Sequence, residues 1–139
     1  MVMKSKLFLS AVFFQLLLLY TSCDDNHKFT IIENHNVSVC GITDPLKNIE
    51  WLATFCKEHT NAVLNISIRV FSNKSTDENH YVISFVNSNP IEYSREEIYD
   101  CSGRKLFFKG IEGPKPVGWD DFFMENESVA TIWELQQKK

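Results

Sequence analysis

Apolar residues recur at helical spacing in the first half of the chain. They are Leu46, Ile49, Leu52, Phe55 and Cys56. Steps of three and four residues bring these side chains to one side of a helix, so the stretch is predicted to be an amphipathic helix with one buried face. Asp44 is the expected N-cap, and Pro45 suits the first helical position because no N–H is needed there. We expect the helix to end near His59.

Farther along, the apolar period changes to two. Residues 64–70 alternate between aliphatic and polar side chains, and residues 81–85 place Tyr, Ile and Phe at every second position. Both patterns predict strands. Residues 97–101 and 105–108 are predicted to form two more strands, joined by a tight turn at Ser102-Gly103, where glycine accepts a positive φ. These four strands are expected to form an antiparallel meander.

Glycine and proline mark the connection that follows. Residues 109–118 hold three of the five glycines and two of the four prolines, which predicts a loop. The spacing of Gly110 and Gly113 does not match a phosphate-binding loop. Residues 120–124 are predicted to form a short helix capped by an aspartate, and residues 129–135 a last strand.

The order of these elements predicts an α+β fold in a single small domain, residues 39–139. We expect the N-terminal helix to pack on an antiparallel sheet of about four to five strands, followed by the short C-terminal helix and the last strand. With 11 Phe, three Trp and four Tyr, the chain has enough large apolar side chains to form a sizeable core.

Residues 1–22 are predicted to be a secretory signal peptide. Two lysines precede the apolar stretch 7–20, which is too short to span a bilayer as a helix. Cys23 then follows a pair of small residues, the position at which a bacterial lipoprotein receives its lipid, so Cys23 is the predicted anchor to the lipid bilayer. The alternative is ordinary signal-peptidase cleavage after Cys23, because Tyr20 stands where leucine is usual.

Residues 23–38 are predicted to form an acidic tether between the anchor and the domain. An edge strand is the alternative for its apolar trio, Phe29, Ile31 and Ile32. Without the signal peptide the net charge falls from −4 to −6, because two lysines and no acid are removed. This acidity argues against nucleic acid as a partner and against direct attraction to anionic lipid.

Cys40, Cys56 and Cys101 remain in the predicted domain, and one disulfide with one free thiol is the simplest arrangement in an oxidising compartment. We expect Cys101 to pair with Cys40, because this bridge would fasten the N-terminal segment to the sheet. Cys56 is the competing partner, and three buried thiols are the further alternative. No two cysteines have the spacing of a zinc site, so no metal is expected.

No catalytic residues are assigned from the sequence, so neither an enzyme nor a cofactor is expected. The four histidines include no i, i+4 pair, and none lies beside a conventional nucleophile motif. Glu96 and Glu97 are adjacent, and adjacent side chains in a strand diverge to opposite faces. Trp119, near Gly110 and Gly113 in the loop, is the candidate ligand-binding residue, and burial in the core is the alternative for its indole.

Four segments carry a family resemblance. Residues 39–52 read Val-Cys-Gly-Ile-Thr-Asp-Pro-Leu-Lys-Asn-Ile-Glu-Trp-Leu, residues 98–103 read Ile-Tyr-Asp-Cys-Ser-Gly, and residues 110–113 and 121–123 read Gly-Ile-Glu-Gly and Asp-Phe-Phe. Together they resemble the landmarks of small, uncharacterised lipoproteins common in gut Bacteroidota. In that family a CG-x-x-[DN]-P-L-x-x-L-x-W-L segment opens the domain, and a [YF]-[ND]-C-x-G turn and a G-G-x-x-G loop follow.

The resemblance covers residues 39 to about 135 and implies no established activity. Ile49 stands where leucine is usual in the family, and Lys109 where the first glycine is usual. Asp24 and Asp25, directly after the anchor cysteine, resemble the start of surface-exposed lipoproteins of these bacteria. This likeness implies export to the outer leaflet of the outer membrane.

The predicted function is that of a lipid-anchored, surface-exposed lipoprotein that serves as a non-catalytic binding module for a protein or a glycan. The partner would contact the open face of the sheet or the loop 109–119. An inhibitor of a secreted enzyme is the alternative, because a loop stiffened by proline suits insertion into an active site. A eukaryotic secreted glycoprotein is a further alternative, since Asn36, Asn65, Asn73 and Asn126 each begin an N-x-S/T sequon.

Overall fold

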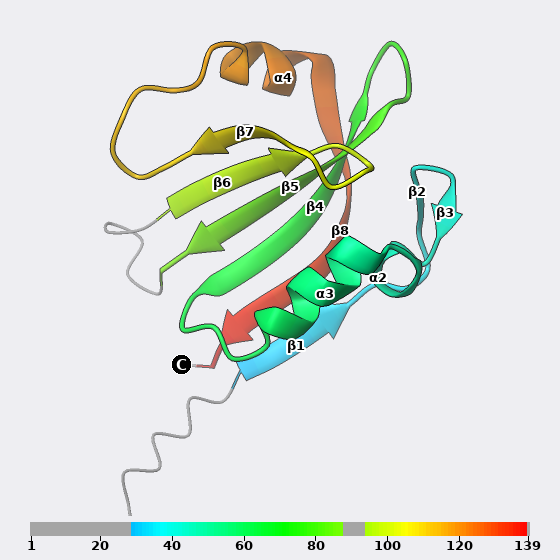
Figure 1. The fold of residues 1–139 in the computed structure, drawn as a ribbon, viewed down its shortest axis with the longest axis vertical. Coiled ribbons are helices and arrows are strands. Elements are labelled where there is room, and N and C mark those ends of the chain that lie inside the picture. Colours follow the sequence, from blue (N-terminus) through cyan, green and yellow to red (C-terminus); the bar gives the residue numbers. More distant parts are fainter. Residues whose placement is uncertain (1–28, 88–93, 139) are drawn as a thin grey trace, which may run out of the picture.

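The structure is a computed structural model that describes residues 29–87 and 94–138 (Figure 1). Its elements in chain order are β1 (Phe29–Glu33), β2 (Ser38–Val39), β3 (Ile42–Thr43), α2 (Pro45–Asn48), α3 (Glu50–Glu58), β4 (Asn65–Asn73), β5 (Asn79–Val86), β6 (Ser94–Tyr99), β7 (Lys105–Lys109), α4 (Trp119–Glu125) and β8 (Asn126–Gln137). Cys23 and the predicted signal peptide lie outside the described residues. Within the described residues, no helix is long and apolar enough to cross a membrane.

Six strands form one antiparallel sheet in the order β1-β8-β4-β5-β6-β7, and β2 and β3 form a separate hairpin. Strands β4 to β7 are neighbours in sequence order, which confirms the predicted meander. The last strand, β8, lies between β1 and β4. Ile68 of β4 therefore faces Ile83 of β5 on one side and Trp133 of β8 on the other, while Ile31 of β1 faces Leu135 of β8.

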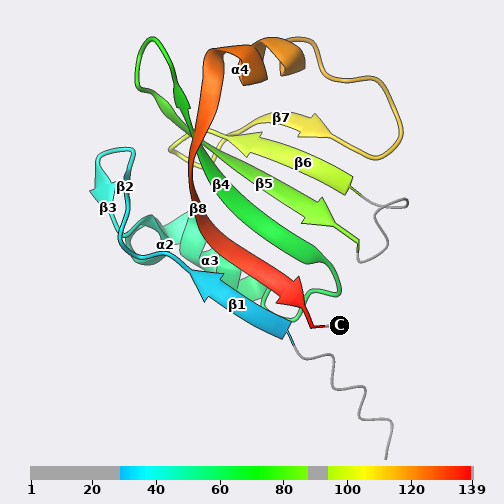
Figure 2. The ribbon, with the colours of Figure 1, turned by 180° about the vertical axis from the view of Figure 1, so that it is seen from behind.

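One face of the sheet packs against α2 and α3, which lie in front of it in Figure 1 and behind it in Figure 2. Side chains in a strand alternate between the two faces, so every second residue of β4 and β5 points to these helices. The buried residues on this side include Leu52 and Cys56 of α3 together with Ile68, Ile83 and Trp133 of the sheet. They form the larger of the two cores in the described residues.

The opposite face is partly covered by α4. Phe71, Val82 and Ile98 of the sheet form a second core there with Trp119 and Phe122 of the helix. The sheet itself separates the two cores, because adjacent residues such as Val82 and Ile83 point to opposite faces.

The predicted α+β fold is wrong, both in its sheet of four to five strands and in its single N-terminal helix. The described residues are mostly sheet, because the strands contain more than twice as many residues as the helices and the main sheet has six strands. Ile49 is extended, with φ −105° and ψ 109°, and splits the predicted helix into pieces of four and nine residues. The sheet also begins at Phe29, inside the segment 23–38 expected as a tether, because the apolar trio there forms edge strand β1.

Neither predicted aspartate cap forms. Asp44 precedes α2 in a left-handed conformation, and its carboxylate bonds His35 rather than a helical N–H. Helix α4 begins one residue earlier than expected, after Gly118, whose φ of 84° favours glycine. Asp120 and Asp121 lie in the first turn of α4, where their negative charge suits the helix dipole. The predicted end of the first helix is confirmed, since His59 is the C-cap of α3.

Candidate functional site

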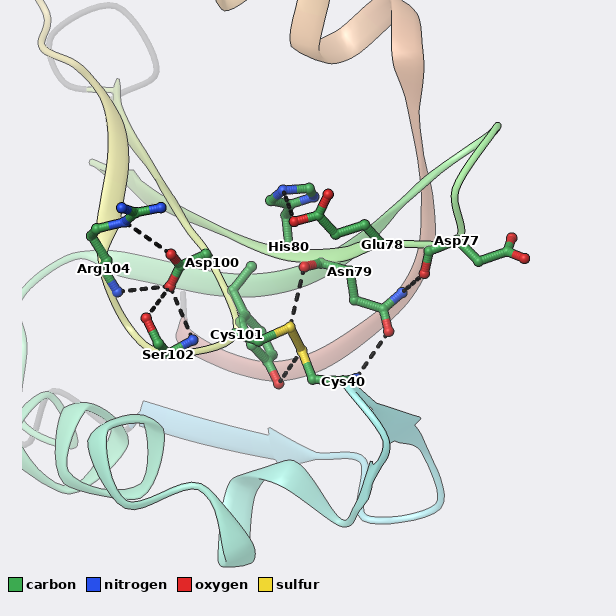
Figure 3. The surroundings of a disulfide bond; sticks show 10 residues. Cys40, Asp77, Glu78, Asn79, His80, Asp100, Cys101, Ser102 and Arg104 are labelled. Atoms are coloured by element: carbon green, nitrogen blue, oxygen red, sulfur yellow. Dashed lines mark hydrogen bonds and ion pairs between the residues drawn. A yellow bond between two sulfur atoms is a disulfide. The ribbon is translucent and has the colours of Figure 1, made fainter.

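A disulfide joins Cys40 to Cys101 and fastens the β2–β3 hairpin to the turn after β6 (Figure 3). This is the pair that the sequence analysis favoured over Cys56, which is a buried free thiol. Asn79 of β5 lies beside both ends: its Oδ1 accepts the Cys40 N–H at 2.9 Å, and its carbonyl oxygen lies 3.3 Å from the Cys101 sulfur. Burial raises the pKa of the Cys56 thiol to about 12, so this cysteine stays protonated and is a poor nucleophile.

Trp119, the candidate ligand-binding residue, is part of the second core. Its indole is 4% exposed, and its ring packs against Phe107 and Phe123 with centroids 6.4 and 5.3 Å away. The Lys109 ammonium lies 5.8 Å from the ring centroid. A ring held in this way anchors the loop that precedes it and offers no open face to a ligand.

The loop between β7 and α4, residues 110–118, projects away from the sheet (Figure 1). Val117 is 99% exposed and Ile111 is 46% exposed. Gly110 and Gly113, the other predicted site residues, lie in this loop. A Cβ at Gly113 would meet nothing within 4 Å, and one at Gly110 would meet only the Phe108 ring and a backbone oxygen of the loop. The loop therefore presents apolar side chains on an open backbone.

Contacts near α4 hold the end of this loop. Lys115 Nζ lies 2.7 Å from the Asp120 carboxylate, and the Trp119 N–H donates to the Pro116 carbonyl at 3.1 Å. Pro114 and Pro116 restrict their own φ angles. These contacts and the two prolines restrict the segment around Val117, which lowers the entropy cost of binding there.

A groove of about 580 Å³ lies between α3 and β6. Its lining includes Glu50, Trp51, Phe55, Glu58 and Tyr99. The Trp51 ring stacks on Tyr99 with centroids 5.3 Å apart, and a Cβ at Gly103 would come within 2.7 Å of it. Phe55 stacks on His59 at 4.0 Å. The aromatic rings of this groove therefore pack mainly on one another.

One carboxylate is buried in the sheet beside this groove. Glu97 is 5% exposed, and Glu96 forms its ion pair on the opposite face, so the predicted divergence is confirmed. The Glu97 carboxylate lies 3.1 Å from Lys105 Nζ and 3.4 Å from Arg95 Nε, and it accepts a hydrogen bond from the Tyr99 hydroxyl. Burial, and then this hydrogen bond, raise the pKa of Tyr99 above its usual value. Arg95, Glu97 and Tyr99 lie at alternate positions of β6 and therefore share one face, and Lys105 joins them from the neighbouring strand β7.

The described histidines have three different surroundings. His35 is exposed and bonds Asp44 at 2.8 Å and Glu33 at 3.0 Å, and these carboxylates raise the pKa of its imidazole. His59 bonds a main-chain oxygen of the last turn of α3 at 2.8 Å. His80 is buried next to α4. Among the described residues, no group of three or more His, Cys, Asp and Glu could hold a metal ion.

The four sequon asparagines differ in access. Asn126 is 5% exposed and donates its amide to a carbonyl of α4 at 2.8 Å. Asn65 and Asn73 are half-buried, and each accepts main-chain N–H groups through its Oδ1. Asn36 alone of the four is exposed. Because a glycan needs an accessible amide nitrogen, three of the four sequons are poor acceptors in the folded chain.

Comparisons of the chain with models of protein families, with curated proteins and with solved structures find no match.

Proposed function

We propose that this chain is a lipoprotein, anchored to the outer membrane through Cys23, that acts as a non-catalytic binding module for a protein partner at the cell surface. The observation that carries the proposal is the loop 110–118. It exposes Val117 almost completely and Ile111 by nearly half, while its base is fastened by the buried Trp119. Apolar side chains held in water on a restricted backbone are a feature of protein-binding surfaces.

A protein fits this loop better than a glycan does. Glycan recognition by stacking needs an aromatic ring with an open face, and Trp119 has none. The exposed side chains of the loop are aliphatic, and they gain most from an apolar pocket on a partner. A protein supplies such a pocket, with a polar rim that can pair with the charged Lys115 and Asp120.

The position of the loop in the molecule agrees with an anchor at Cys23. The start of β1 lies at the opposite end of the domain from the loop 110–118 in both ribbon views (Figures 1 and 2). Five residues separate Cys23 from Phe29, so their Cα atoms are at most about 20 Å apart. An anchor at Cys23 would hold that end near the bilayer and turn the loop toward a partner.

The surroundings of two buried side chains, the Cys56 thiol and the Tyr81 phenol, support a non-catalytic role. Burial raises the pKa of Cys56 and of Tyr81 to about 12 in each case. Both groups are held protonated, which is the opposite of what a nucleophile needs.

Site-specific photo-crosslinking tests the proposal. A photoreactive phenylalanine analogue replaces Val117 in the full-length chain, and intact producing cells are irradiated. We expect an adduct of discrete size that contains a second polypeptide, because Val117 would sit in the partner's pocket. The matched control carries the same analogue at Val63, which is 68% exposed in the α3–β4 connection, and it should give no such adduct.

The substitution Ile111→Asp in the Val117 crosslinker chain should remove the adduct, because it places a charge in the same contact. Equal adducts at positions 117 and 63, or none at 117, would contradict the proposal. An adduct whose added mass is removed by glycosidases, and which contains no second polypeptide, would show a glycan partner instead.

An inhibitor of a secreted enzyme is the second candidate, favoured by the two prolines that stiffen the loop. If the crosslinked partner is a hydrolase, purified chain should lower its activity, and Val117→Asp should relieve this inhibition. A partner with no activity to inhibit would leave the binding module as the function.

A further inference from the structure

The groove between α3 and β6 is separate from the loop 110–118, and the proposed function does not use it. Tyr99 of β6 and Ser102 of the following turn line one side of this groove. The other side is one stripe of α3, formed by Glu50, Trp51, Thr54, Phe55 and Glu58.

Three polar side chains follow one another along this stripe. Glu50, Thr54 and Glu58 are exposed, and residues four apart lie on the same side of a helix. With a rise of about 1.5 Å per residue, the two glutamates are about 12 Å apart along the helix axis, and Thr54 lies midway. The rim of the groove therefore presents a carboxylate, a hydroxyl and a second carboxylate in a row.

The charge of the groove is negative. Its described lining holds two carboxylates and no lysine or arginine. Two bases on β6 and β7, Arg95 and Lys105, lie 3.4 and 3.1 Å from the Glu97 carboxylate and are already paired with it. Among the described residues, neither Glu50 nor Glu58 forms an ion pair. Charge complementarity therefore favours a basic partner for this groove.

The dimensions of the groove favour an extended chain over a helix. Spread along about 12 Å of α3, its volume of about 580 Å³ gives a cross-section of about 50 Å² and a width of about 7 Å. A helix with its side chains is about 10–12 Å across and is too wide. Alternate residues of an extended chain advance about 6.7 Å, close to the advance of about 6 Å between successive rim residues.

We propose that the groove between α3 and β6 binds an extended segment of another protein, with a basic residue at the first and fifth of five positions. The two basic side chains pair with Glu50 and Glu58. The third side chain of the segment is apolar and lies between them, against the rings of Trp51 and Phe55 that line the groove. The second and fourth side chains point away from the groove, because side chains alternate along an extended chain.

Titration of the folded, full chain with acetyl-Lys-Thr-Leu-Thr-Lys-amide tests the proposal, with the indole N–H resonances of the three tryptophans followed by NMR. We expect a saturable shift of the Trp51 resonance. Trp119 is 4% exposed and belongs to the core on the other face of the sheet, so its resonance should not move. Acetyl-Lys-Lys-Leu-Thr-Thr-amide has the same composition and charge with the wrong spacing, and it should bind about threefold more weakly or worse.

Substitutions on the rim test the two charges. Glu50→Gln with Glu58→Gln keeps the groove and should weaken binding about two- to tenfold. The matched control, Glu125→Gln with Glu127→Gln, changes the net charge equally at exposed positions outside the lining. It should leave the affinity unchanged in about 0.15 M salt, which screens distant charges. Glu50→Lys with Glu58→Lys should bind acetyl-Glu-Thr-Leu-Thr-Glu-amide, and the original chain should not.

No saturable shift of the Trp51 resonance with the first peptide would overturn the proposal. Equal binding of the two lysine peptides would overturn it in favour of attraction by net charge alone. Equal binding of the acidic peptide by the original chain would overturn it in favour of an apolar groove. Ile111→Asp should leave peptide binding unchanged, because the loop 110–118 contributes no residue to the described lining, so this test is independent of the proposed function.

Discussion

Gly103 shows how much depends on the absence of one side chain. Its φ is 86°, and a Cβ built on it would lie 2.7 Å from the Trp51 ring. That ring is itself held by Tyr99 and Tyr81, with centroids 5.3 and 5.4 Å away. Neither partner can give way easily, because both belong to the sheet.

We therefore expect Gly103→Ala to lower the free energy of unfolding by about 1–3 kcal/mol, from backbone strain and from displacement of Trp51. Urea denaturation followed by tryptophan fluorescence measures the loss. The matched control is Gly41→Ala, where φ is 73° and no atom lies within 4 Å of the added carbon. Gly41→Ala should lower the free energy of unfolding only through backbone strain, by about 1 kcal/mol. Equal decreases in stability at the two positions would show that the contact with the Trp51 ring contributes nothing.

His35 gives the fold a pH dependence. Its hydrogen bond to Asp44, and then that to Glu33, raise the pKa of the imidazole above 6.5. Since protonation is favoured in the folded state, the contribution to stability is complete below the ordinary pKa and is lost as the pH rises through the folded value. NMR titration should give a His35 pKa above 6.5 that falls toward it in Asp44→Asn, because asparagine keeps the left-handed backbone and loses the charge. A pKa unchanged by this substitution would contradict the assignment.

At the scale of elements, the Cys40–Cys101 disulfide ties the β2–β3 hairpin to the end of β6 across 61 residues of sequence. The hairpin and β6 do not pair with each other as strands. The disulfide and the contacts of Asn79 with both cysteines therefore link them. The double variant Cys40→Ser, Cys101→Ser should lower the free energy of unfolding by about 2–4 kcal/mol, because the unfolded chain regains the entropy of an open loop.

Guanidinium denaturation under oxidising conditions measures this loss. Cys56→Ala keeps the bridge and should cost no more than about 1 kcal/mol. Three titratable thiols in the unfolded, oxidised wild-type chain would contradict the disulfide.

At the scale of the whole molecule, the domain presents the start of β1 at one end and the loop 110–118 at the other (Figure 1). If Cys23 is lipidated, Cys23→Ala should release the chain from the membrane fraction, and mass spectrometry should find an acylated N-terminus at Cys23 in the wild type. External protease should also digest the chain on intact cells. An unmodified N-terminus at Asp24 would contradict the lipid anchor. Full protection of the chain from external protease until the outer membrane is opened would contradict the surface location.

Local patterns in the sequence were enough to predict several elements. The period of two predicted the strands around residues 64–70 and 81–85, and the meander of β4 to β7 follows because its strands are joined in sequence order. The turn at Ser102-Gly103 and the end of α3 at His59 are likewise local, since backbone angles and capping depend on a few adjacent residues. These features needed no information from distant parts of the chain.

The tertiary structure decided what depends on residues far apart in sequence. Insertion of β8 between β1 and β4, with Ile31 opposite Leu135, changes the fold from the expected α+β arrangement to a mostly β one. Burial of Trp119 also depends on residues distant in sequence, because α4 packs on Phe71, Val82 and Ile98 of the sheet. The hydrophobic pattern predicts which residues are buried. It does not predict which residues they pack against, because that depends on the apolar surface buried and the hydrogen bonds formed by the whole molecule.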